Sequence, residues 1–250
     1  MFEASPFPGG RSQGDEISVY DTSELYGEKG RFRVLQFSGE AAQGALDLEQ
    51  PRRIVFEYPR AMIHLMEHNM AYFEDVFMIG HGIGTIAGHY PDKRFKVAEI
   101  HPDIVRLSRE HFGYSLDNVT IGDGRALLAL EPDRRYDYII VDAFTSSGTP
   151  QHLCSSEFFA LTRSKLHRRG YLLLNLMGRS DNDRKISAVL TTLGEHYSHA
   201  MAFALLSGGP ADLCNFILIA GDQPIRYQAR HLAGFTETEP AQGHIIRDSR

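Results

Sequence analysis

The fold of this chain is decided by residues 75–99, which read DVFMIGHGIGTIAGHYPDKRFKVAE. The segment begins with a short apolar run, residues 76–79, which has the length and composition of a fully buried strand. A glycine-rich turn follows, and then a stretch that can form a short helix. A second apolar run, residues 95–98, ends at the acidic residue Glu99. The succession of strand, turn, helix and strand predicts the first βαβ unit of a nucleotide-binding α/β domain.

The turn carries glycine at every second position, at Gly80, Gly82 and Gly84. Glycine lets the backbone turn tightly and approach a ligand, and a helix N-terminus offers free N–H groups. The carboxylate of Glu99 can accept both hydroxyls of a ribose. A dinucleotide fingerprint reads G-x-G-x-x-G, whereas this turn reads G-x-G-x-G-T. The spacing therefore favours a ligand without a pyrophosphate, such as S-adenosylmethionine. The alternative is a glycine-rich turn that binds nothing, but three glycines in one turn cost chain entropy that packing alone would not require.

Composition limits the class of protein. The chain has 250 residues, enough for one large α/β domain with a small appendage. It has no apolar run near the length of a membrane span and no secretion signal at its start, so we expect no membrane partner. Its two cysteines, Cys154 and Cys214, suit a reducing cytoplasm and lack metal-ligand spacing, so we expect a cytoplasmic protein without a metal site. A net charge of −6 argues against nucleic acid as a partner.

Four regions differ in their pattern along the chain. We expect a loose N-terminus at residues 1–15, a small antiparallel β domain at 16–50, a nucleoside-binding α/β domain at 51–222 and a polar C-terminal tail at 223–250. An amphipathic helix is predicted over residues 52–69, with an interruption near Pro59.

Alternating strands and helices continue through the α/β domain. Strands are predicted at 118–121, 136–141, 171–176, 200–206 and 215–220, and helices at 102–112, 157–166 and 183–197. The last two strands should be antiparallel, because their short link cannot make a parallel crossover. The pattern predicts a class I methyltransferase-like, Rossmann-like sheet of seven strands, preceded by the small antiparallel β domain.

The first four strands of the α/β domain each end in a glycine or an acid. These residues are Gly80, Glu99, Asp123 and Asp142. Ligands of open α/β sheets bind beyond the carboxyl ends of the strands, so the four residues should meet at one site. The alternative is that the acids cap the helices that follow them. Asp142 follows an almost wholly apolar strand and is the candidate general base.

In this order, these residues resemble the spermidine synthase family of aminopropyltransferases, over about residues 17–220. The resemblance implies that Asp142 is the proton acceptor, as the first aspartate of the family's D-x-x-D motif. It also implies that Pro150, within one residue of alignment, lies against the adenine. The positions that hold the adenosine in the family are matched by Gln43, Glu99, Asp123 and Gly124.

The departures from the family fall together on the amine side of the site. Ile83 replaces the aspartate of the glycine turn, and Thr145 replaces the second acid of D-x-x-D. The family's Tyr-His-Glu segment reads Tyr58-Pro59-Arg60. A polyamine in a dry cleft needs carboxylate partners, so putrescine should be a poor acceptor. Arg60 could instead recognise a carboxylate, or it could be a solvated arginine on a helix.

The sequence therefore favours a group transferase that takes S-adenosylmethionine or its decarboxylated form as donor substrate, or binds methylthioadenosine, without a metal. Its partners should be a small-molecule acceptor and a second copy in a homodimer. One alternative is a non-catalytic nucleoside-binding or scaffold protein, against which Asp142 argues. A second alternative is an S-adenosylmethionine-dependent methyltransferase. A third is a nicotinamide-dependent oxidoreductase, and the glycine spacing disfavours only this one.

Overall fold

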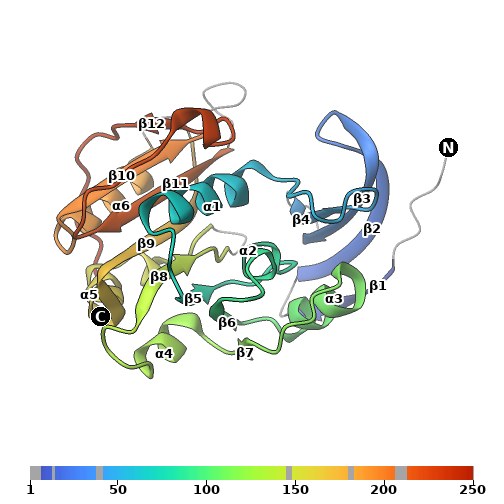
Figure 1. Cartoon of the computed structure of the whole chain (residues 1–250), viewed down its shortest axis with the longest axis horizontal. Helices are drawn as coiled ribbons and strands as arrows, with labels where there is room; N and C mark the ends of the chain where they lie inside the picture. The colour runs from blue at the N-terminus through green and yellow to red at the C-terminus, as the bar shows by residue number, and fades with distance from the viewer. Residues whose placement is uncertain are drawn as a thin grey trace.

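The computed structural model describes residues 7–12, 15–37, 42–144, 148–179, 183–205 and 213–249. Two sheets lie side by side in it (Figure 1). The smaller, N-terminal sheet has the order β1-β2-β3-β4 and is antiparallel throughout. Its strands are β1 (Phe7–Ser12), β2 (Asp15–Leu25), β3 (Glu28–Phe37) and β4 (Ala42–Asp47).

The larger sheet has the order β12-β10-β11-β9-β8-β5-β6-β7. Its strands β5, β6, β7, β8 and β9 are parallel. Beyond β9, three antiparallel pairings follow: β11 with β9, β10 with β11 and β12 with β10. The chain turns back between β5 and β8, which is the switch point where such sheets bind ligands. The strands are β5 (Asp75–Ile79), β6 (Arg94–Glu99), β7 (Val119–Ile121), β8 (Tyr136–Val141), β9 (Leu166–Arg179), β10 (His199–Ala204), β11 (Leu213–Gly221) and β12 (Thr236–Thr238).

The seven predicted strands of this sheet are all present, and the terminal pair is antiparallel as expected. The class I methyltransferase-like fold is thus confirmed. The eighth strand, β12, comes from the segment in which the sequence shows no pattern, because its three residues are too few to produce one.

Helices cover both faces of the larger sheet because successive strand residues point to opposite sides. On one face, Phe77 and Ile79 of β5 share a core with α5 and α6. On the other face, Val76 and Met78 pack with α1 and α2. The helices are α1 (Glu57–Asn69), α2 (Thr85–His89), α3 (Pro102–Phe112), α4 (Gly124–Ala129), α5 (Ser156–Lys165) and α6 (Arg184–Gly194), with short 3₁₀ turns η1 (Gln151–Leu153) and η2 (Ala229–His231).

The predicted start of the first helix is wrong. Helix α1 begins at Glu57 rather than at residue 52, and Pro59 lies in its first turn. Backbone N–H groups in that turn have no carbonyl partner within the helix, so the N–H that proline lacks costs no hydrogen bond. The preceding residues form a linker, residues 48–56, in which Ile54 makes an isolated antiparallel bridge to Leu46 of β4. The linker therefore ties the N-terminal sheet directly to α1.

The C-terminal segment is built into the core. Leu232 and Phe235 are fully buried on the α1 face of the larger sheet, and Ile246 packs on the opposite face. Asp248 accepts two hydrogen bonds from the guanidinium of Arg125, at 2.8 and 2.6 Å. Among the described residues, no helix is both long and apolar enough to cross a membrane.

Candidate active site

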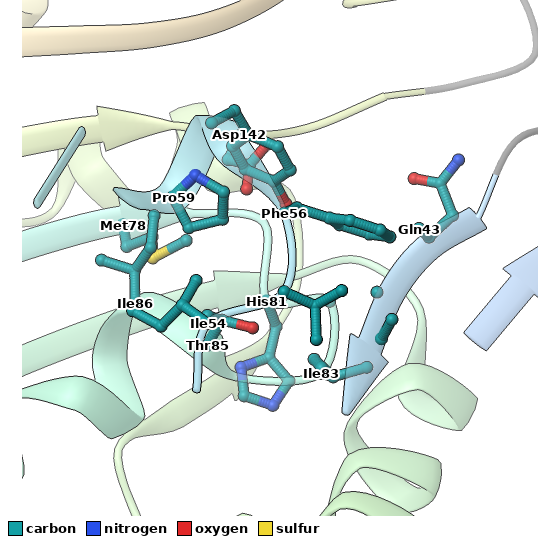
Figure 2. Close-up of a pocket in the computed structure, with 15 residues that line it drawn as sticks. Gln43, Ile54, Phe56, Pro59, Met78, His81, Ile83, Thr85, Ile86 and Asp142 are labelled. Carbon is teal, nitrogen blue, oxygen red and sulfur yellow. The ribbon is translucent and has the colours of Figure 1, made fainter. Parts of the chain in front are cut away.

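A pocket opens between the carboxyl ends of β5 and β8 and the N-terminal sheet (Figure 2). We call it the interdomain pocket. It encloses about 360 Å³, including space open to solvent. Strand β4, the linker, the start of α1, the glycine turn and the end of β8 all contribute to its wall. The lining residues are Gln43, Gly44, Ala45, Ile54, Val55, Phe56, Tyr58, Pro59, Met78, His81, Gly82, Ile83, Thr85, Ile86 and Asp142.

The glycine turn is shaped by close packing. Gly80 has a φ of +95°, and a Cβ atom there would lie 1.9 Å from the carbonyl oxygen of Asp142. Gly84 has a φ of +85°, and its Cβ would lie 2.2 Å from the ring of Tyr114. A side chain is excluded at both positions by backbone conformation and by space. The turn therefore presses against the end of β8 and fixes the position of Asp142.

Two polar side chains hydrogen-bond to the carboxylate of Asp142, and a third supports one of them. Asn175 of β9 donates a hydrogen bond to its Oδ1 atom at 2.9 Å, and the hydroxyl of Tyr58 also hydrogen-bonds to it. Asn175 in turn accepts from Asn215 of β11 at 3.0 Å. Burial raises the pKa of Asp142 to about 6, although both hydrogen bonds act to lower it. A carboxylate with that pKa is ionised at neutral pH and still basic enough to take a proton.

Glu99 lies beside the glycine turn, outside the lining of the interdomain pocket. Its two carboxylate oxygens accept the backbone N–H groups of His81 and His101, each at 2.9 Å. Burial raises the pKa of Glu99, and the two backbone hydrogen bonds oppose that shift. Each oxygen keeps a second lone pair, so the carboxylate can still accept from a ligand hydroxyl.

Asp123 caps the helix that follows it, as the alternative interpretation of the strand-end acids predicts. Its Oδ1 atom accepts the N–H of Ala126 at 2.8 Å, and its Oδ2 atom lies 3.2 Å from Nε2 of His152. A Cβ atom on Gly124 would lie 2.3 Å from Cγ2 of Ile79, so this position also requires glycine. Pro150 immediately precedes η1, the turn that carries His152.

The predicted site residues are thus divided between two places. Gln43, Gly82 and Asp142 line the interdomain pocket. The others, which the resemblance mostly assigns to the adenosine, lie outside its lining at the ends of β5, β6 and β7 and before η1. These are Gly80, Gly84, Glu99, Asp123, Gly124 and Pro150.

The predicted departures from the family pattern have different outcomes. Ile83 lines the interdomain pocket and packs so tightly on β4 that a Cβ atom at Gly44 would lie 2.6 Å from its Cγ2. Arg60 does not line it; this arginine is exposed and pairs with Glu57 at 3.0 Å. The idea that Arg60 faces a ligand carboxylate is therefore wrong. Thr145 lies outside the described residues.

Two residues near Asp142 were missed by sequence reasoning. Asn175 is the one amide in the apolar run YLLLNLM, and a polar side chain in a buried strand is a signal that could have identified it. His81, within the glycine turn, is only 4% exposed, and its Nε2 atom lies 2.8 Å from Oγ of Ser108. The hydroxyl of Ser108 donates its hydrogen bond to the carbonyl oxygen of Val105. It must therefore accept from His81, which donates to it through Nε2–H.

We expect His81 to make folding sensitive to mild acid. Burial lowers its pKa from 6.5 to about 4, so the unfolded chain binds a proton between these values while the native protein does not. The contribution of His81 to the free energy of unfolding should fall by about 2 kcal/mol between pH 7.5 and 5.0. Urea unfolding of the parent and of His81→Gln at both pH values measures it.

The matched control is His89→Gln, which changes an exposed histidine eight residues further along the same segment. His89→Gln should leave the difference between the two pH values unchanged, whereas His81→Gln should reduce it. If the two variants show the same pH dependence as the parent, His81 is not the group that titrates.

A second set of histidines lies away from the site. His64 and His68 are four residues apart on α1, a spacing that the expectation of no metal site overlooked, and the ring of His231 lies beside that of His64. The ring centroid of His64 lies 5.3 Å from that of His68 and 5.4 Å from that of His231. Nε2 of His64 accepts a hydrogen bond from the backbone N–H of Gln228. Within the described ranges, no group of three or more His, Cys, Asp or Glu side chains is arranged to hold a metal ion.

Comparison with known proteins yields related sequences, although no family model matches the chain. The chain is 27% identical to a polyamine aminopropyltransferase of Vibrio vulnificus over 245 residues, which cover 92% of this chain and 81% of that protein. It is 29% identical over 126 residues to putrescine N-methyltransferase 2 of Nicotiana attenuata, covering 46% of this chain and 34% of that one.

Solved structures share the fold. A probable spermidine synthase from Corynebacterium glutamicum superimposes with a TM-score of 0.82 at 20% identity, covering 100% of this chain and 98% of that chain. A spermidine synthase in complex with the transition state analogue AdoDATO gives a TM-score of 0.64 at 14% identity, covering 92% and 84%. The likeness extends over both sheets.

Proposed function

The chain belongs with the spermidine synthase family, and on that premise we propose that it is a group transferase that binds S-adenosylmethionine, its decarboxylated form or methylthioadenosine. The observation that carries the proposal is the placement of Asp142. Its carboxylate lies in the interdomain pocket, against the glycine turn, with hydrogen bonds from Tyr58 and Asn175. A structural aspartate would not need a pocket at its carboxylate.

The reaction requires one proton acceptor and alignment of the two reactants. A protonated amine that enters the interdomain pocket gives one proton to the carboxylate of Asp142. The free nitrogen lone pair then attacks the carbon bound to the sulfonium. The new nitrogen–carbon bond forms as the carbon–sulfur bond breaks. The electron pair of the broken bond stays on sulfur, which becomes a neutral thioether. Tyr58 and Asn175 hold the carboxylate in place and stabilise its ionised form.

The proposal includes a changed acceptor. Ile83 presents an apolar side chain to the interdomain pocket where the resemblance implies an acid. We therefore expect putrescine to be a poor acceptor, for lack of a carboxylate to pair with its second ammonium group. Arg60 is exposed and contributes no charge to the lining, so the expectation depends on Ile83.

Transfer of a methyl group from S-adenosylmethionine is the second candidate. The observation in its favour is again Ile83, because the loss of an acid there removes a partner for the ammonium of a transferred aminopropyl group. Incubating each donor with the same acceptors separates the two: methylthioadenosine forms from the decarboxylated donor, and S-adenosylhomocysteine forms from the other. A scaffold protein would consume neither donor.

Calorimetric titration tests the nucleoside part of the proposal. The protein is titrated with S-adenosylmethionine, the decarboxylated donor, methylthioadenosine and NAD. We expect Glu99→Ala to weaken binding of adenosyl ligands by about 1.5–3 kcal/mol, because the carboxylate loses its hydrogen bonds to ribose hydroxyls. Glu99→Gln, which keeps one acceptor oxygen, should lose less.

The control is Glu110→Ala, which removes an exposed glutamate paired with Arg106 on α3. Circular dichroism verifies that each variant is folded, since Glu99 also holds two backbone N–H groups. Unchanged adenosyl affinity in folded Glu99→Ala would contradict the ribose assignment. Binding of NAD alone would overturn the proposed function.

A further inference from the structure

The charge of the interdomain pocket is unusual for a site that receives an amine. Of the described residues that line it, Asp142 is the only carboxylate, and none is a lysine or an arginine. Gln43 and Thr85 are uncharged, and His81 stays neutral at pH 7 because burial depresses its pKa. The lining therefore offers one negative charge, and that charge lies at the end of β8.

Apart from these groups and Tyr58, which hydrogen-bonds to Asp142, the lining side chains are apolar. Figure 2 shows Phe56, Pro59 and Met78 near Asp142, with Ile83 below them and Gln43 on β4 to one side. Ile83 is held against the backbone of β4 at Gly44, so it cannot swing away to admit a polar group without moving the strand. An apolar wall of this kind binds hydrocarbon and penalises a charge that it cannot pair.

The charge and the apolar wall of the interdomain pocket together restrict the part of the acceptor molecule that does not react. Among the described lining residues, a diamine that places one ammonium at Asp142 finds no second carboxylate, so its other ammonium lies against apolar side chains. A monoamine with a hydrocarbon body leaves only hydrocarbon there. We infer that the acceptor is a primary monoamine with an apolar body, whose nitrogen lies at Asp142 and whose body packs between Phe56 and Ile83. This inference rests on the proposed function.

A pair of nearly isosteric amines tests it. Pentylamine and putrescine share a chain of four methylene groups attached to one amino group, and they differ only in ending in a methyl or an ammonium group. Each is titrated calorimetrically into the parent protein saturated with methylthioadenosine. We expect pentylamine to bind at least tenfold more tightly than putrescine, about the factor that leaving one buried polar group unpaired produces. Equal affinities, tighter binding of putrescine, or no binding of either amine would overturn the inference.

Two variants at one position sharpen the test. Ile83→Asp places a carboxylate in the apolar wall and should shift the preference toward putrescine by at least tenfold relative to the parent. Ile83→Asn is the matched control, since asparagine has nearly the same size without the charge, and it should produce no such shift. Equal shifts in both variants would mean that lost packing, rather than charge, sets the preference.

The amines are also titrated without the nucleoside, so that the two proposals can fail separately. If methylthioadenosine does not bind, the proposed function fails, and the two amine affinities alone decide the acceptor inference. If methylthioadenosine binds and the parent prefers putrescine, the proposed function stands and the inference fails. Turnover of the preferred amine with each donor then measures whether the order of affinities is also the order of kcat/KM.

Discussion

Replacing Asp142 with asparagine should lower turnover by about 10²–10⁴-fold, the range for loss of a general base. Asparagine keeps the size of the side chain and can still hydrogen-bond to Tyr58 and Asn175, but it cannot take the proton of an attacking amine. Adenosyl-ligand affinity should change much less than turnover. The measurement is donor consumption with the amine that supports the fastest reaction, alongside calorimetric titration with methylthioadenosine.

The pH dependence of the parent gives an independent readout of the same residue. Burial raises the pKa of Asp142 to about 6, so kcat/KM should be constant above that pH and fall tenfold per pH unit below it. The control variant is Asp92→Asn, an exposed aspartate after α2, which should retain parent activity. Unchanged turnover in Asp142→Asn would move the base to another residue. If no amine, thiol or carboxylate acceptor leads to donor consumption by the parent, the scaffold hypothesis is favoured.

Replacing Gly80 with alanine should destabilise the fold by about 3 kcal/mol or more, which is the size of effect expected when a forbidden backbone conformation and a steric overlap coincide. The added methyl carbon would lie 1.9 Å from the carbonyl oxygen of Asp142, and neither backbone can move without breaking the pairing of β5 with β8. The free energy of unfolding in urea measures the loss.

Gly113 provides the matched control. It follows α3 with a φ of +72°, and nothing lies within 4 Å of the position that a Cβ atom would take. Gly113→Ala should therefore lose only the cost of the left-handed conformation, about 1–2 kcal/mol. Similar losses in the two variants would show that the contact with Asp142 contributes nothing beyond backbone strain.

Local pattern was sufficient for most of the larger sheet. Strand β8 and helix α3 begin and end where the sequence predicts, because each is a continuous apolar or amphipathic segment with clear boundaries. The glycine turn and the acids at strand ends were also recognisable, since backbone geometry restricts which residues occupy them. Pro59 misled the prediction because a proline in a helix can mark its first turn as well as an interruption.

The organisation of the site depended on contacts that local pattern does not encode. Asn215 and Asn175 lie in two strands, Asp142 directly follows a third, and Tyr58 lies in α1, so only the assembled sheet brings them together. The position of Arg60 could not be read from spacing, because one turn of a helix decides whether a side chain faces the pocket or the solvent. The sequence thus predicted Asp142 as the candidate base, and the structure adds the side chains that hydrogen-bond to its carboxylate.

The way the C-terminal segment is incorporated affects when the protein can finish folding during its synthesis. Strand β12 pairs with β10, Ile246 completes one face of the core, and Asp248 holds Arg125 beside the strand-end acid Asp123. These residues are synthesised after β10, so the β10 edge of the larger sheet stays unpaired until they have emerged from the ribosome. Until then the nascent chain exposes the apolar surface around β10, and aggregation of exposed apolar surface is the hazard that chaperones limit.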